Sequence, residues 1–598
     1  MCGIIGFKGT SNLNAVDVIL HGLKTLEYRG YDSWGIAVLQ NSPAKKPSIS
    51  VLKAVGKIGL FDDLKKKKKL GTSSMGIGHT RWATHGAVTK TNAHPQLTAD
   101  KSIAVVHNGI VENYQELRSW LEERGYKFSS QTDTEVIPHL FDYYLKKGLP
   151  EEEAARKTFL RLKGHYAVVI LNKSSQKILA AKNGSPLVAG FNDKDLFVAS
   201  DVPAFLKYTR KVIFLDDMEL VVLNDGISLF DIKSGRRKRR KHDTISWSPE
   251  QAKKGNYPHF MIKEIEEQHE SIRRAINQDD KKIMEIASQI KNSFGTFFVG
   301  CGSSFHAALT ASYLFSMIAN KHINVVLGSE FPNYISFLKK DSLIIPISQS
   351  GETADILDAV RAAKKKKSKI YSIVNVMGSS LMRMSDHTFL MNAGPEICVL
   401  STKSYTSQLV VLTLLAYASA GRLQEGKEEL LKAARHVEDY FKPEYGARLK
   451  KLASRIAKYH HIFVIGRSLN YPTALEAALK IKEVSYIHAE GFPGGELKHG
   501  SIALIEKNTP CFVFAPMDET YHEILSNAME IKSRGGYIIG VSPKDNKIFD
   551  FHIPVPKDHF TSPILNIIPI QILAYHLAVK LGRDPDKPRN LAKSVTVR

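Results

Sequence analysis

The second residue of the chain is a cysteine that could act as a nucleophile. Removal of Met1 would leave Cys2 with both a thiol and a free α-amine. These groups titrate near ~8.5 and ~8, so the amine could act as a general base towards the sulfur near neutral pH. A cysteine after an initiator methionine can also be an ordinary small residue, and this segment alone does not decide between the two interpretations.

Three polar clusters further along supply the groups that hydrolysis of an amino-acid amide requires. They are residues 78–86 (GHTRWATHG), 107–113 (HNGIVEN) and 132–135 (TDTE). Taken singly, they could be an ion-pair arginine, a hairpin turn and a helix cap. Taken with Cys2, the arginine could hold an α-carboxylate and the aspartate an α-ammonium. An asparagine side chain and the following backbone N–H could stabilise an oxyanion.

Six motifs of this region resemble the glutaminase domain of class II glutamine amidotransferases. They are CGIIGF (2–7), LEYRGYDS (26–33), HTRWATHG (79–86), NAHP (92–95), HNGIVEN (107–113) and TDTEV (132–136). That family has an N-terminal-nucleophile fold, an α/β/β/α sandwich. The resemblance implies that Cys2 attacks the glutamine amide and that Asn108 and Gly109 stabilise the oxyanion. It also implies a glutamine-binding set, which consists of Arg81, Trp82, Thr84, His85 and Asp133.

The second half of the chain is an internal repeat of strands and helices. A strand at 296–299 followed by GCGSS recurs as a strand at 462–465 followed by GRS. The offset of roughly 165 residues is maintained for the later strands, which indicates a duplication. Because strands alternate with helices, we expect a doubly wound parallel sheet in each copy. Such sheets bind ligands beyond the carboxyl ends of their strands.

The two copies differ after their next strand. The first copy has SQSGET (348–353) before a helix, whereas the second has APMDET (515–520). Hydroxyls, an amide and a glycine at a helix N-terminus suit a phosphate, although the same residues could only cap the helix. We favour the phosphate interpretation. The segment 401–404 (STKS) has the same chemistry with a weaker signal.

The second copy carries ionisable groups instead. Glu476, Lys480 and Glu483 recur at i, i+4 and i+7 of a predicted helix over 474–486, so they share one face. An exposed salt-bridge face would show the same spacing. His499 lies in a predicted loop and would titrate near neutrality, while Lys593 lies in a polar tail that composition alone would class as frayed.

Five motifs carry a second resemblance, to amidotransferases that convert a ketose phosphate into an amino-sugar phosphate. They are SQSGETADI (348–356), STKSYTSQL (401–409), LEAALKIKEVSYIHAE (475–490), GELKHG (495–500) and RNLAKSVTV (589–597). The resemblance implies L-glutamine as nitrogen donor, fructose 6-phosphate as acceptor, a closed ammonia passage and a homodimer. It assigns a sugar-phosphate set, which consists of Ser303, Ser304, Ser348, Gln349, Ser350, Thr353 and Ser401.

The same resemblance assigns the chemistry at the sugar. Lys593 would form the imine with the open-chain ketose, and Glu483 would move a proton between C1 and C2. His499 would assist ring opening, and Lys480 would support the developing charge. The implied fold is a glutaminase sandwich followed by two doubly wound sugar-isomerase domains. We expect the glutaminase at 1–235, a linker at 236–255, and isomerase domains at 256–425 and 426–598.

Composition limits the other classes of function. The net charge of +23 lies partly in basic runs at 65–69, 236–241 and 364–367. These lack interleaved aromatic residues, so we expect solvated segments that attract anionic metabolites and no nucleic-acid partner. Four scattered cysteines favour a reducing, cytoplasmic location without a metal site. The apolar stretch 564–581 is interrupted by polar residues, so we expect a buried helix, with no membrane partner.

Two other classes of enzyme and one class of binding protein could carry some of these motifs. Phosphoribosyl transfer and asparagine synthesis share the glutaminase domain, but the second half lacks their pyrophosphate-binding and ATP-binding motifs, and no motif indicates any other cofactor. A sugar-phosphate sensor with vestigial catalytic groups is an alternative from a different class. The joint presence of Cys2, Glu483, His499 and Lys593 favours an enzyme.

Overall fold

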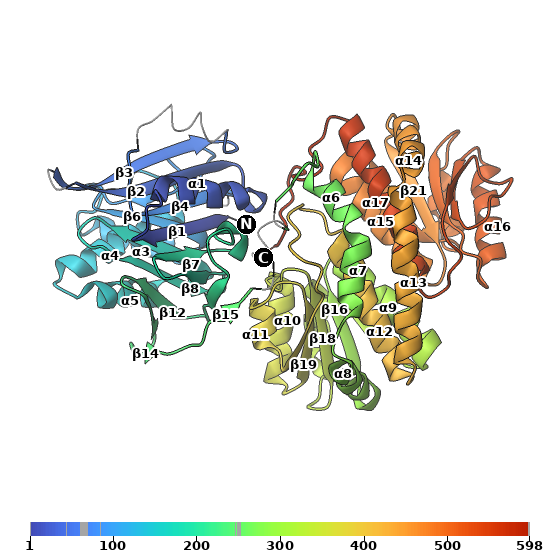
Figure 1. The fold of residues 1–598 in the computed structure, drawn as a ribbon, viewed down its shortest axis with the longest axis horizontal. Coiled ribbons are helices and arrows are strands. Elements are labelled where there is room, and N and C mark those ends of the chain that lie inside the picture. The colour runs from blue at the N-terminus through green and yellow to red at the C-terminus, as the bar shows by residue number, and fades with distance from the viewer. Residues whose placement is uncertain are drawn as a thin grey trace. The chain divides into compact units, whose positions relative to one another are not determined.

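The computed structural model describes residues 2–42, 45–59, 70–83, 85–245, 247, 251 and 253–595. The chain divides into two compact units (Figure 1). The first comprises residues 1–252 together with the C-terminal tail from residue 592, and the second comprises residues 253–591.

Two antiparallel sheets form the centre of the first unit. The eight-stranded sheet has the order β15-β11-β9-β10-β1-β4-β2-β3, and the seven-stranded sheet has the order β14-β13-β12-β8-β7-β6-β5. The strands of the first sheet are β1 (Gly3–Gly9), β2 (Ser33–Ser42), β3 (Lys45–Val55), β4 (Met75–Arg81), β9 (Val188–Phe191), β10 (Asp195–Ala199), β11 (Lys211–Phe214) and β15 (Asp243–Thr244). Those of the second are β5 (Gln96–Leu97), β6 (Ile103–Gly109), β7 (Tyr166–Asn172), β8 (Ile178–Asn183), β12 (Glu219–Leu223), β13 (Ile227–Asp231) and β14 (Arg237–Lys238).

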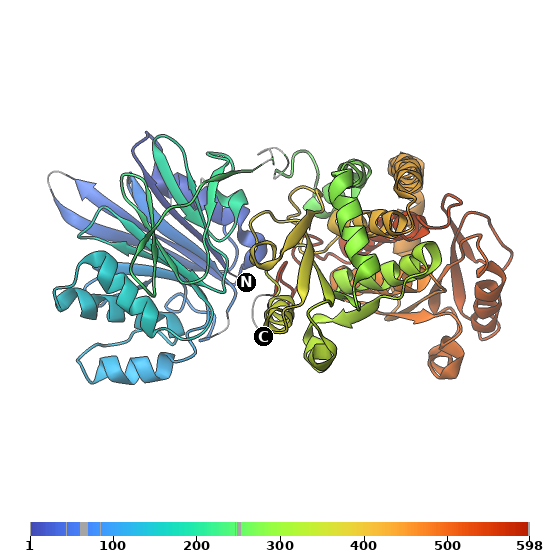
Figure 2. The same ribbon diagram turned by 90° about the horizontal axis from the view of Figure 1, so that it is seen from below.

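Helices cover the outer faces of this pair of sheets. Helix α1 (Ala15–Thr25) packs on β1 and β4, whereas α3 (Tyr114–Glu122), α4 (Val136–Lys146) and α5 (Glu151–Arg161) cover the second sheet. Figure 2 shows these three cyan helices grouped on one side of the strands. Strand β1 is therefore buried on both faces: Ile4 lies in the core between the sheets, and Ile5 lies under α1. The predicted α/β/β/α sandwich is confirmed.

The basic run 236–241 lies against this sandwich. It includes β14, and Lys238 and Arg240 both pair with the fully buried Glu219, at 3.1 and 2.7 Å. The Arg240 guanidinium also donates to the carbonyl oxygen of Phe214 at 2.5 Å. A buried carboxylate requires partners, and these two cations of the predicted linker supply them.

The second unit contains two five-stranded parallel sheets of equal topology. Their orders are β17-β16-β18-β19-β20 and β22-β21-β23-β24-β25. The strands are β16 (Thr296–Gly300), β17 (Asn324–Leu327), β18 (Leu343–Ser348), β19 (Lys369–Val374), β20 (His387–Leu390), β21 (His461–Gly466), β22 (His488–Pro493), β23 (Pro510–Phe514), β24 (Tyr537–Ser542) and β25 (Phe551–Pro554). The predicted duplication into two doubly wound sheets is confirmed.

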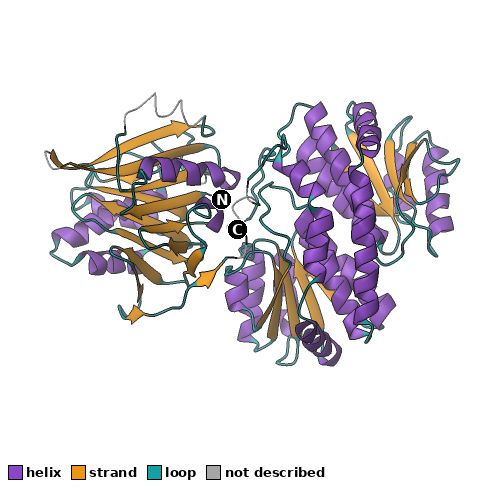
Figure 3. Ribbon diagram, viewed as in Figure 1, coloured by secondary structure: helices purple, strands orange, loops and turns teal. Residues whose placement is uncertain are grey.

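A shared layer of helices lies between the two sheets (Figure 3). Helices α9, α12, α15 and α17 pack on one another, and one apolar core runs through both copies. The helices of this unit are α6 (Phe260–Glu266), α7 (Gln268–Ile276), α8 (Asp280–Asn292), α9 (Ser303–Ala319), α10 (Ala354–Lys365), α11 (Ser380–Met384), α12 (Lys403–Ser419), α13 (Leu423–Glu438), α14 (Pro443–Ile456), α15 (Asn470–Ser485), α16 (Tyr521–Lys532) and α17 (Ser562–Lys580). Helix α17 has the length and apolarity of a membrane span, but 89% of its apolar window is buried inside the protein.

Candidate active sites

Cys2 lies just before β1 and is held at the end of β4. The backbone N–H of Trp82 donates to Cys2 Sγ at 3.1 Å, and the N–H of Gly3 donates to Thr80 Oγ1 at 3.1 Å. A side chain on Gly3 would meet Thr80 Oγ1 at 2.7 Å, so the strand approaches β4 closely only because this residue is glycine. Burial raises the pKa of the Cys2 thiol, against the opposing effects of the Trp82 N–H and Arg81. The sulfur therefore needs a base to become a thiolate near neutral pH.

The predicted oxyanion pair reaches Cys2 from the other sheet. Asn108 and Gly109 end β6, and Asn108 Nδ2 donates to the backbone carbonyl oxygen of Cys2 at 2.9 Å. Gly109 has φ = 110°, and a Cβ there would lie 1.9 Å from the carbonyl oxygen of His165. Only glycine fits this turn. The structure thus brings the predicted nucleophile and the predicted oxyanion amide together.

Arg81 and Asp133 are both buried in the same unit. The Arg81 guanidinium donates to the carbonyl oxygens of residues 85–87, which fixes the position of its positive charge. Burial lowers the Arg81 pKa, and Cys2 and Asp133 oppose that effect. Asp133 Oδ2 accepts the N–H of Val111 at 2.8 Å. Thr84, the other predicted member between them, lies outside the described residues.

The aromatic members of the glutamine set pack against tyrosines. The Trp82 ring lies edge-on to Tyr31 with 5.6 Å between centroids, and the His85 ring lies edge-on to Tyr114 at the same separation. These contacts hold both rings in defined orientations beside the segment that carries Arg81. Their assignment to glutamine stays a prediction.

Two charged residues near Cys2 were not identified from the sequence. Arg29 Nε donates to the Cys2 carbonyl oxygen at 3.4 Å and Arg29 pairs with Asp201 at 2.9 Å. Asp32 Oδ2 accepts the N–H of Ala83 at 2.9 Å. Both belong to the LEYRGYDS motif, so the signal was present, but nothing in the local pattern showed which residues these side chains would contact.

The SQSGET segment of the first copy curves around the start of α10. Ser348 Oγ accepts the N–H of Gly351 at 3.0 Å and lies 3.3 Å from Thr353 Oγ1. Ser350 Oγ accepts the N–H of Glu352 at 3.2 Å. Hydroxyls and the N-terminus of a helix are thereby gathered at the carboxyl end of β18. This is the arrangement that an anion such as phosphate prefers.

Glu352 and the backbone of Gln349 bind neighbouring segments. Glu352 is buried, and its Oε1 accepts the N–H of Ser380 at 2.7 Å, which caps α11. The carbonyl oxygen of Gln349 accepts the N–H of Asn375 at 3.1 Å, which anchors the segment to the next strand. We call residues 348–353 the hydroxyl loop.

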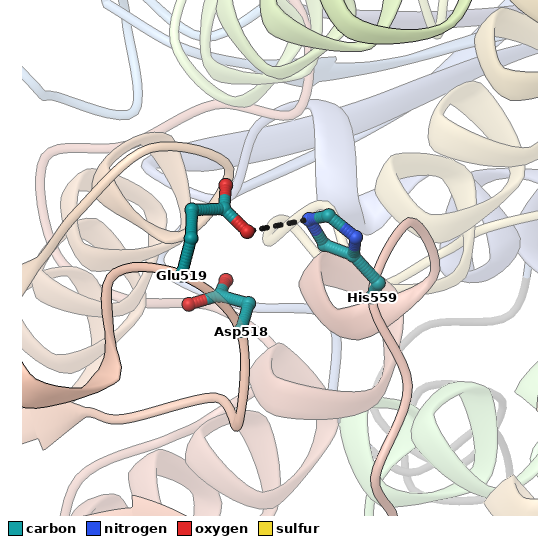
Figure 4. A group of neighbouring side chains, drawn as sticks. All are labelled: Asp518, Glu519 and His559. Atoms are coloured by element: carbon teal, nitrogen blue, oxygen red, sulfur yellow. Dashed lines mark ion pairs between the residues drawn. The ribbon is translucent and has the colours of Figure 1, made fainter.

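The matching segment of the second copy is already occupied by carboxylates (Figure 4). Asp518 Oδ1 accepts the N–H of Thr520 at 2.9 Å and its hydroxyl at 2.7 Å. Glu519 pairs with His559 at 3.5 Å. Asp518, Glu519 and His559 are the group, among the described residues, whose spacing could hold a metal ion. Because Asp518 is bound to Thr520, directly before α16, and Glu519 is largely exposed, we assign these groups to turn formation and ion pairing.

Helix α15 carries a buried ion cluster that α9 completes. Glu476 and Lys480 are both 0% exposed, which excludes an exposed salt-bridge face. Lys480 Nζ lies 2.7 Å from Glu483 Oε2 and 3.4 Å from Glu476 Oε1. Ser303 Oγ donates to Glu476 Oε1 at 2.8 Å, and His306 Nδ1 lies 2.8 Å from Glu476 Oε2. We call Ser303, His306, Glu476, Lys480 and Glu483 the ion cluster.

The charges of this cluster stabilise one another. Burial alone would raise the pKa of Glu476, but Lys480 and His306 hold the pKa below its usual value. Burial would likewise lower the pKa of Lys480, but Glu476 and Glu483 keep that pKa above its usual value. Lys480 is therefore a permanent cation that can support negative charge. Helical spacing predicted that Glu476 lies on this face but suggested no role for it, because its partners on α9 are distant in the sequence.

The second serine-rich helix start is also filled by a carboxylate. Glu396 Oε1 accepts the N–H groups of Thr402 and Ser404 at 2.9 and 3.0 Å. Ser401 Oγ lies 2.6 Å from Ser404 Oγ. An anion already caps this end of α12, so any contact of Ser401 with a sugar phosphate would have to use its hydroxyl beside Glu396.

The last three predicted residues occupy different places. Ser304 is buried in the first turn of α9, after Gly302 with φ = 55°. His499 is exposed at the end of a short 3-10 turn, Leu497–His499, and the hydrogen bonds described for the ion cluster do not include it. Lys593 lies in the tail that belongs to the first unit. Their assigned roles stay predictions.

Comparison with known proteins assigns both halves. A family model described as a glutamine amidotransferase domain matches residues 79–207, and one described as a SIS domain matches residues 290–418 and 455–581. The C-terminal domain of glucosamine-fructose-6-phosphate aminotransferase from Francisella tularensis covers 56% of this chain, with 35% identity and a TM-score of 0.52, over 100% of its own length.

Full-length relatives agree with the domain matches. Proteins named glutamine--fructose-6-phosphate aminotransferase [isomerizing] from Thermococcus kodakarensis and Pyrococcus horikoshii are each 45% identical to this chain, over 100% of it and 100% of their own length. A protein of that name from Methanothermobacter thermautotrophicus is 42% identical over the same shares. The resemblance inferred from the motifs and the predicted enzyme class are confirmed. This chain belongs to the glutamine–fructose-6-phosphate aminotransferase (isomerizing) family.

Proposed function

We propose that this protein transfers the amide nitrogen of L-glutamine to fructose 6-phosphate and isomerises the product to glucosamine 6-phosphate. The observation that carries the proposal is the pair of buried Lys480 and half-buried Glu483, whose side chains lie 2.7 Å apart. A sensor would need the hydroxyl loop but no such acid–base pair. Support also comes from the relatives, whose name states the same donor and acceptor.

The glutaminase step follows from the groups around Cys2. The α-amine of mature Cys2 takes the thiol proton, and Sγ attacks the glutamine amide carbon. Asn108 Nδ2 and the Gly109 N–H stabilise the oxyanion. Collapse of this intermediate breaks the C–N bond, releases ammonia and leaves a thioester, which water then hydrolyses to glutamate. Arg81 and Asp133 hold the amino-acid end, with Trp82, Thr84 and His85 in the same site.

The isomerase step uses the hydroxyl loop and the ion cluster. The loop holds the phosphate through Ser348, Gln349, Ser350 and Thr353, with Ser303, Ser304 and Ser401 as further members of the set. Lys593 forms an imine with the open-chain ketose, and ammonia then takes the place of the lysine nitrogen. His499 assists ring opening.

Proton transfer completes the isomerisation. Glu483 removes a proton from C1 of the imine and returns a proton to C2, while the C1 hydroxyl loses a proton and the imine nitrogen gains one, which leaves an aldehyde at C1 and an amine at C2. Lys480 supports the negative charge that develops in between. The chemistry needs only protons and a Schiff base, so we propose no cofactor.

The proposed assembly follows the same assignment. The glutaminase domain would span 1–235, followed by a linker at 236–255 and isomerase domains at 256–425 and 426–598. Ammonia would pass through a closed channel, since free ammonia is lost to water. We propose a homodimer that works in the cytoplasm and binds neither nucleic acid nor membrane.

A coupled assay tests the proposal. Purified protein confirmed to begin at Cys2 receives glutamine and fructose 6-phosphate, and glutamate and glucosamine 6-phosphate are quantified separately. We expect equal amounts of the two products, with Cys2→Ala abolishing glutamine-dependent synthesis and Lys593→Ala abolishing amino-sugar formation. Glutamate without amino sugar would show a different acceptor, and absence of both products would favour the sensor.

A further inference from the structure

We propose that His79 is a positioning residue that fixes the amide of Asn108 with its Nδ2 towards the nucleophile. This inference rests on the proposed role of Asn108 in glutamine hydrolysis. His79 lies on β4 of the first sheet, whereas Asn108 lies on β6 of the second. The histidine side chain is 0% exposed, so it bridges the two sheets within the dry interior of the sandwich.

The hydrogen bonds of His79 determine its tautomer. Its Nε2 lies 2.9 Å from the carbonyl oxygen of His107 and 3.0 Å from Asn108 Oδ1. A backbone carbonyl oxygen can only accept, so Nε2 must carry the proton. Nδ1 is then the bare nitrogen of the ring, and it is buried without a hydrogen-bond partner among the described residues.

The tautomer in turn determines the orientation of Asn108. With Nε2–H shared between two acceptors, the atom of Asn108 that faces it must be Oδ1. A flipped amide would place its N–H₂ against the Nε2–H of His79, and its oxygen against the carbonyl oxygen of Cys2, which now accepts from Nδ2 at 2.9 Å. The hydrogen bonds of Oδ1 and of Nδ2 therefore require the same orientation of the Asn108 amide. In this orientation the N–H groups of Nδ2 face Cys2.

The ring remains neutral while it does this. Burial lowers the His79 pKa to about 3, against the opposing hydrogen bond to the His107 carbonyl oxygen, and nearby Arg81 lowers it further. A neutral imidazole adds no charge beside the proposed oxyanion site. Its single N–H donates in a fixed direction. The ring therefore orients the Asn108 amide without changing the electrostatic field at the proposed oxyanion site.

The neighbouring histidines contact His79, but their rings bind other partners. The His94 ring packs on that of His79 with centroids 4.1 Å apart, and its Nε2 lies 3.2 Å from Thr134 Oγ1. His107 Nδ1 lies 2.9 Å from the same hydroxyl. His94 is also buried, at 5% exposed, and its Nδ1 accepts the backbone N–H of His107 at 3.4 Å, but it makes no hydrogen bond to Asn108 among the described contacts. His94→Leu is therefore a control for the loss of a buried imidazole that contacts His79 without binding Asn108.

The test is a double-mutant cycle on glutamine hydrolysis by the full-length protein. We expect His79→Leu to lower kcat about 10- to 100-fold with KM nearly unchanged, which is less than the 10²–10³-fold cost of deleting an oxyanion donor. His79→Gln restores an N–H donor near the same place and should keep kcat within about threefold of wild type. His94→Leu should also leave kcat within about threefold.

The combination with Asn108→Ala decides the mechanism. If His79 acts through Asn108, His79→Leu on an Asn108→Ala background lowers kcat no further, whereas independent effects would multiply. Multiplying effects, or equal losses in His79→Leu and His94→Leu, would overturn the inference. A wild-type protein that hydrolyses no glutamine would overturn the proposed function itself, and with it the role of His79.

Discussion

The two isomerase copies share one sheet topology but keep their polar groups in different places. After the first strand of copy one, α9 contains no aspartate, glutamate, lysine or arginine. After the first strand of copy two, α15 carries Glu476, Lys480 and Glu483. The loops differ as well: in the hydroxyl loop of copy one the carboxylate of Glu352 binds the N–H of Ser380 in α11, whereas in copy two the carboxylate of Asp518 binds Thr520, directly before α16.

This difference shows how a duplication can divide a reaction between its halves. Copy one supplies hydroxyls and a helix N-terminus, which suit a bound phosphate, and copy two supplies the ions that could move protons. The buried charges on α15 depend on copy one. Ser303 and His306 on α9 hydrogen-bond to the carboxylate of Glu476, and α15 itself does not supply these hydrogen bonds. Neither copy could bury its half of this arrangement by itself.

Removal of the proposed base on α15, Glu483, should have the largest effect. We expect Glu483→Gln to lower kcat for amino-sugar formation by roughly 10²–10⁴-fold, since general acid–base catalysis contributes that much. Glutamine hydrolysis measured as glutamate release should persist at the separate Cys2 site. Rates of both products from the same reaction would be compared with wild type.

The matched control is Glu523→Gln on α16, where Glu523 pairs with Arg467 at 2.7 Å and is 61% exposed. This variant removes a carboxylate of copy two outside the ion cluster, so amino-sugar formation should be unchanged. If Glu483→Gln kept more than a tenth of the wild-type kcat, copy two would not hold the base.

Removal of hydroxyls from copy one should have an intermediate effect, and on affinity more than on rate. Ser348→Ala combined with Ser350→Ala deletes two donors to the proposed phosphate. Because a hydrogen bond to a charged group contributes about 1.5–3 kcal/mol, we expect KM for fructose 6-phosphate to rise at least about tenfold. Steady-state kinetics at saturating glutamine would measure it.

The corresponding hydroxyl of copy two provides the comparison. Thr520→Ala removes a group that donates to Asp518, so KM for the sugar phosphate should stay at the wild-type value. Equal increases in KM for the two variants would mean that the loops are not specialised, and the comparison between the copies would fail.

The sequence predicted the parts of this arrangement that depend on local pattern. The resemblance of the N-terminal motifs implied the sandwich, and the alternation of strands and helices indicated the two parallel sheets. The spacing of Glu476, Lys480 and Glu483 indicated a common face. The burial of that face could not be predicted, because Ser303 lies 173 residues before Glu476. Helical spacing shows which side chains share a face but not what covers it.

Strand β22 and two residues near Cys2, His79 and Arg29, were not identified from the sequence for related reasons. Strand β22 has the sequence HAEGFP, which has neither alternation nor β-branched residues, and it forms because β21 offers a free edge. His79 and Arg29 read as ordinary polar residues in a strand and a turn. Their roles depend on atoms of Asn108 and Cys2 that are brought near only by the folded sandwich.

The smallest expected effect concerns pH and also distinguishes the copies. The pKa of Glu476 is held below its ordinary value of 4.5 by Lys480 and His306, despite burial. Its charged form therefore contributes stability that is fully present above pH 4.5 and is lost as the pH falls through the lower, folded-state pKa.

Hydrogen exchange of α15 should accelerate on acidification below pH 4.5 more than that of α10, which lies outside the ion cluster. In Glu476→Gln this extra acid sensitivity of α15 should disappear, whereas Glu523→Gln should retain it. If α15 responded to acid identically in wild type and Glu476→Gln, the cluster would not be the source of its stability, and the interdependence of the two copies would have to rest on apolar packing alone.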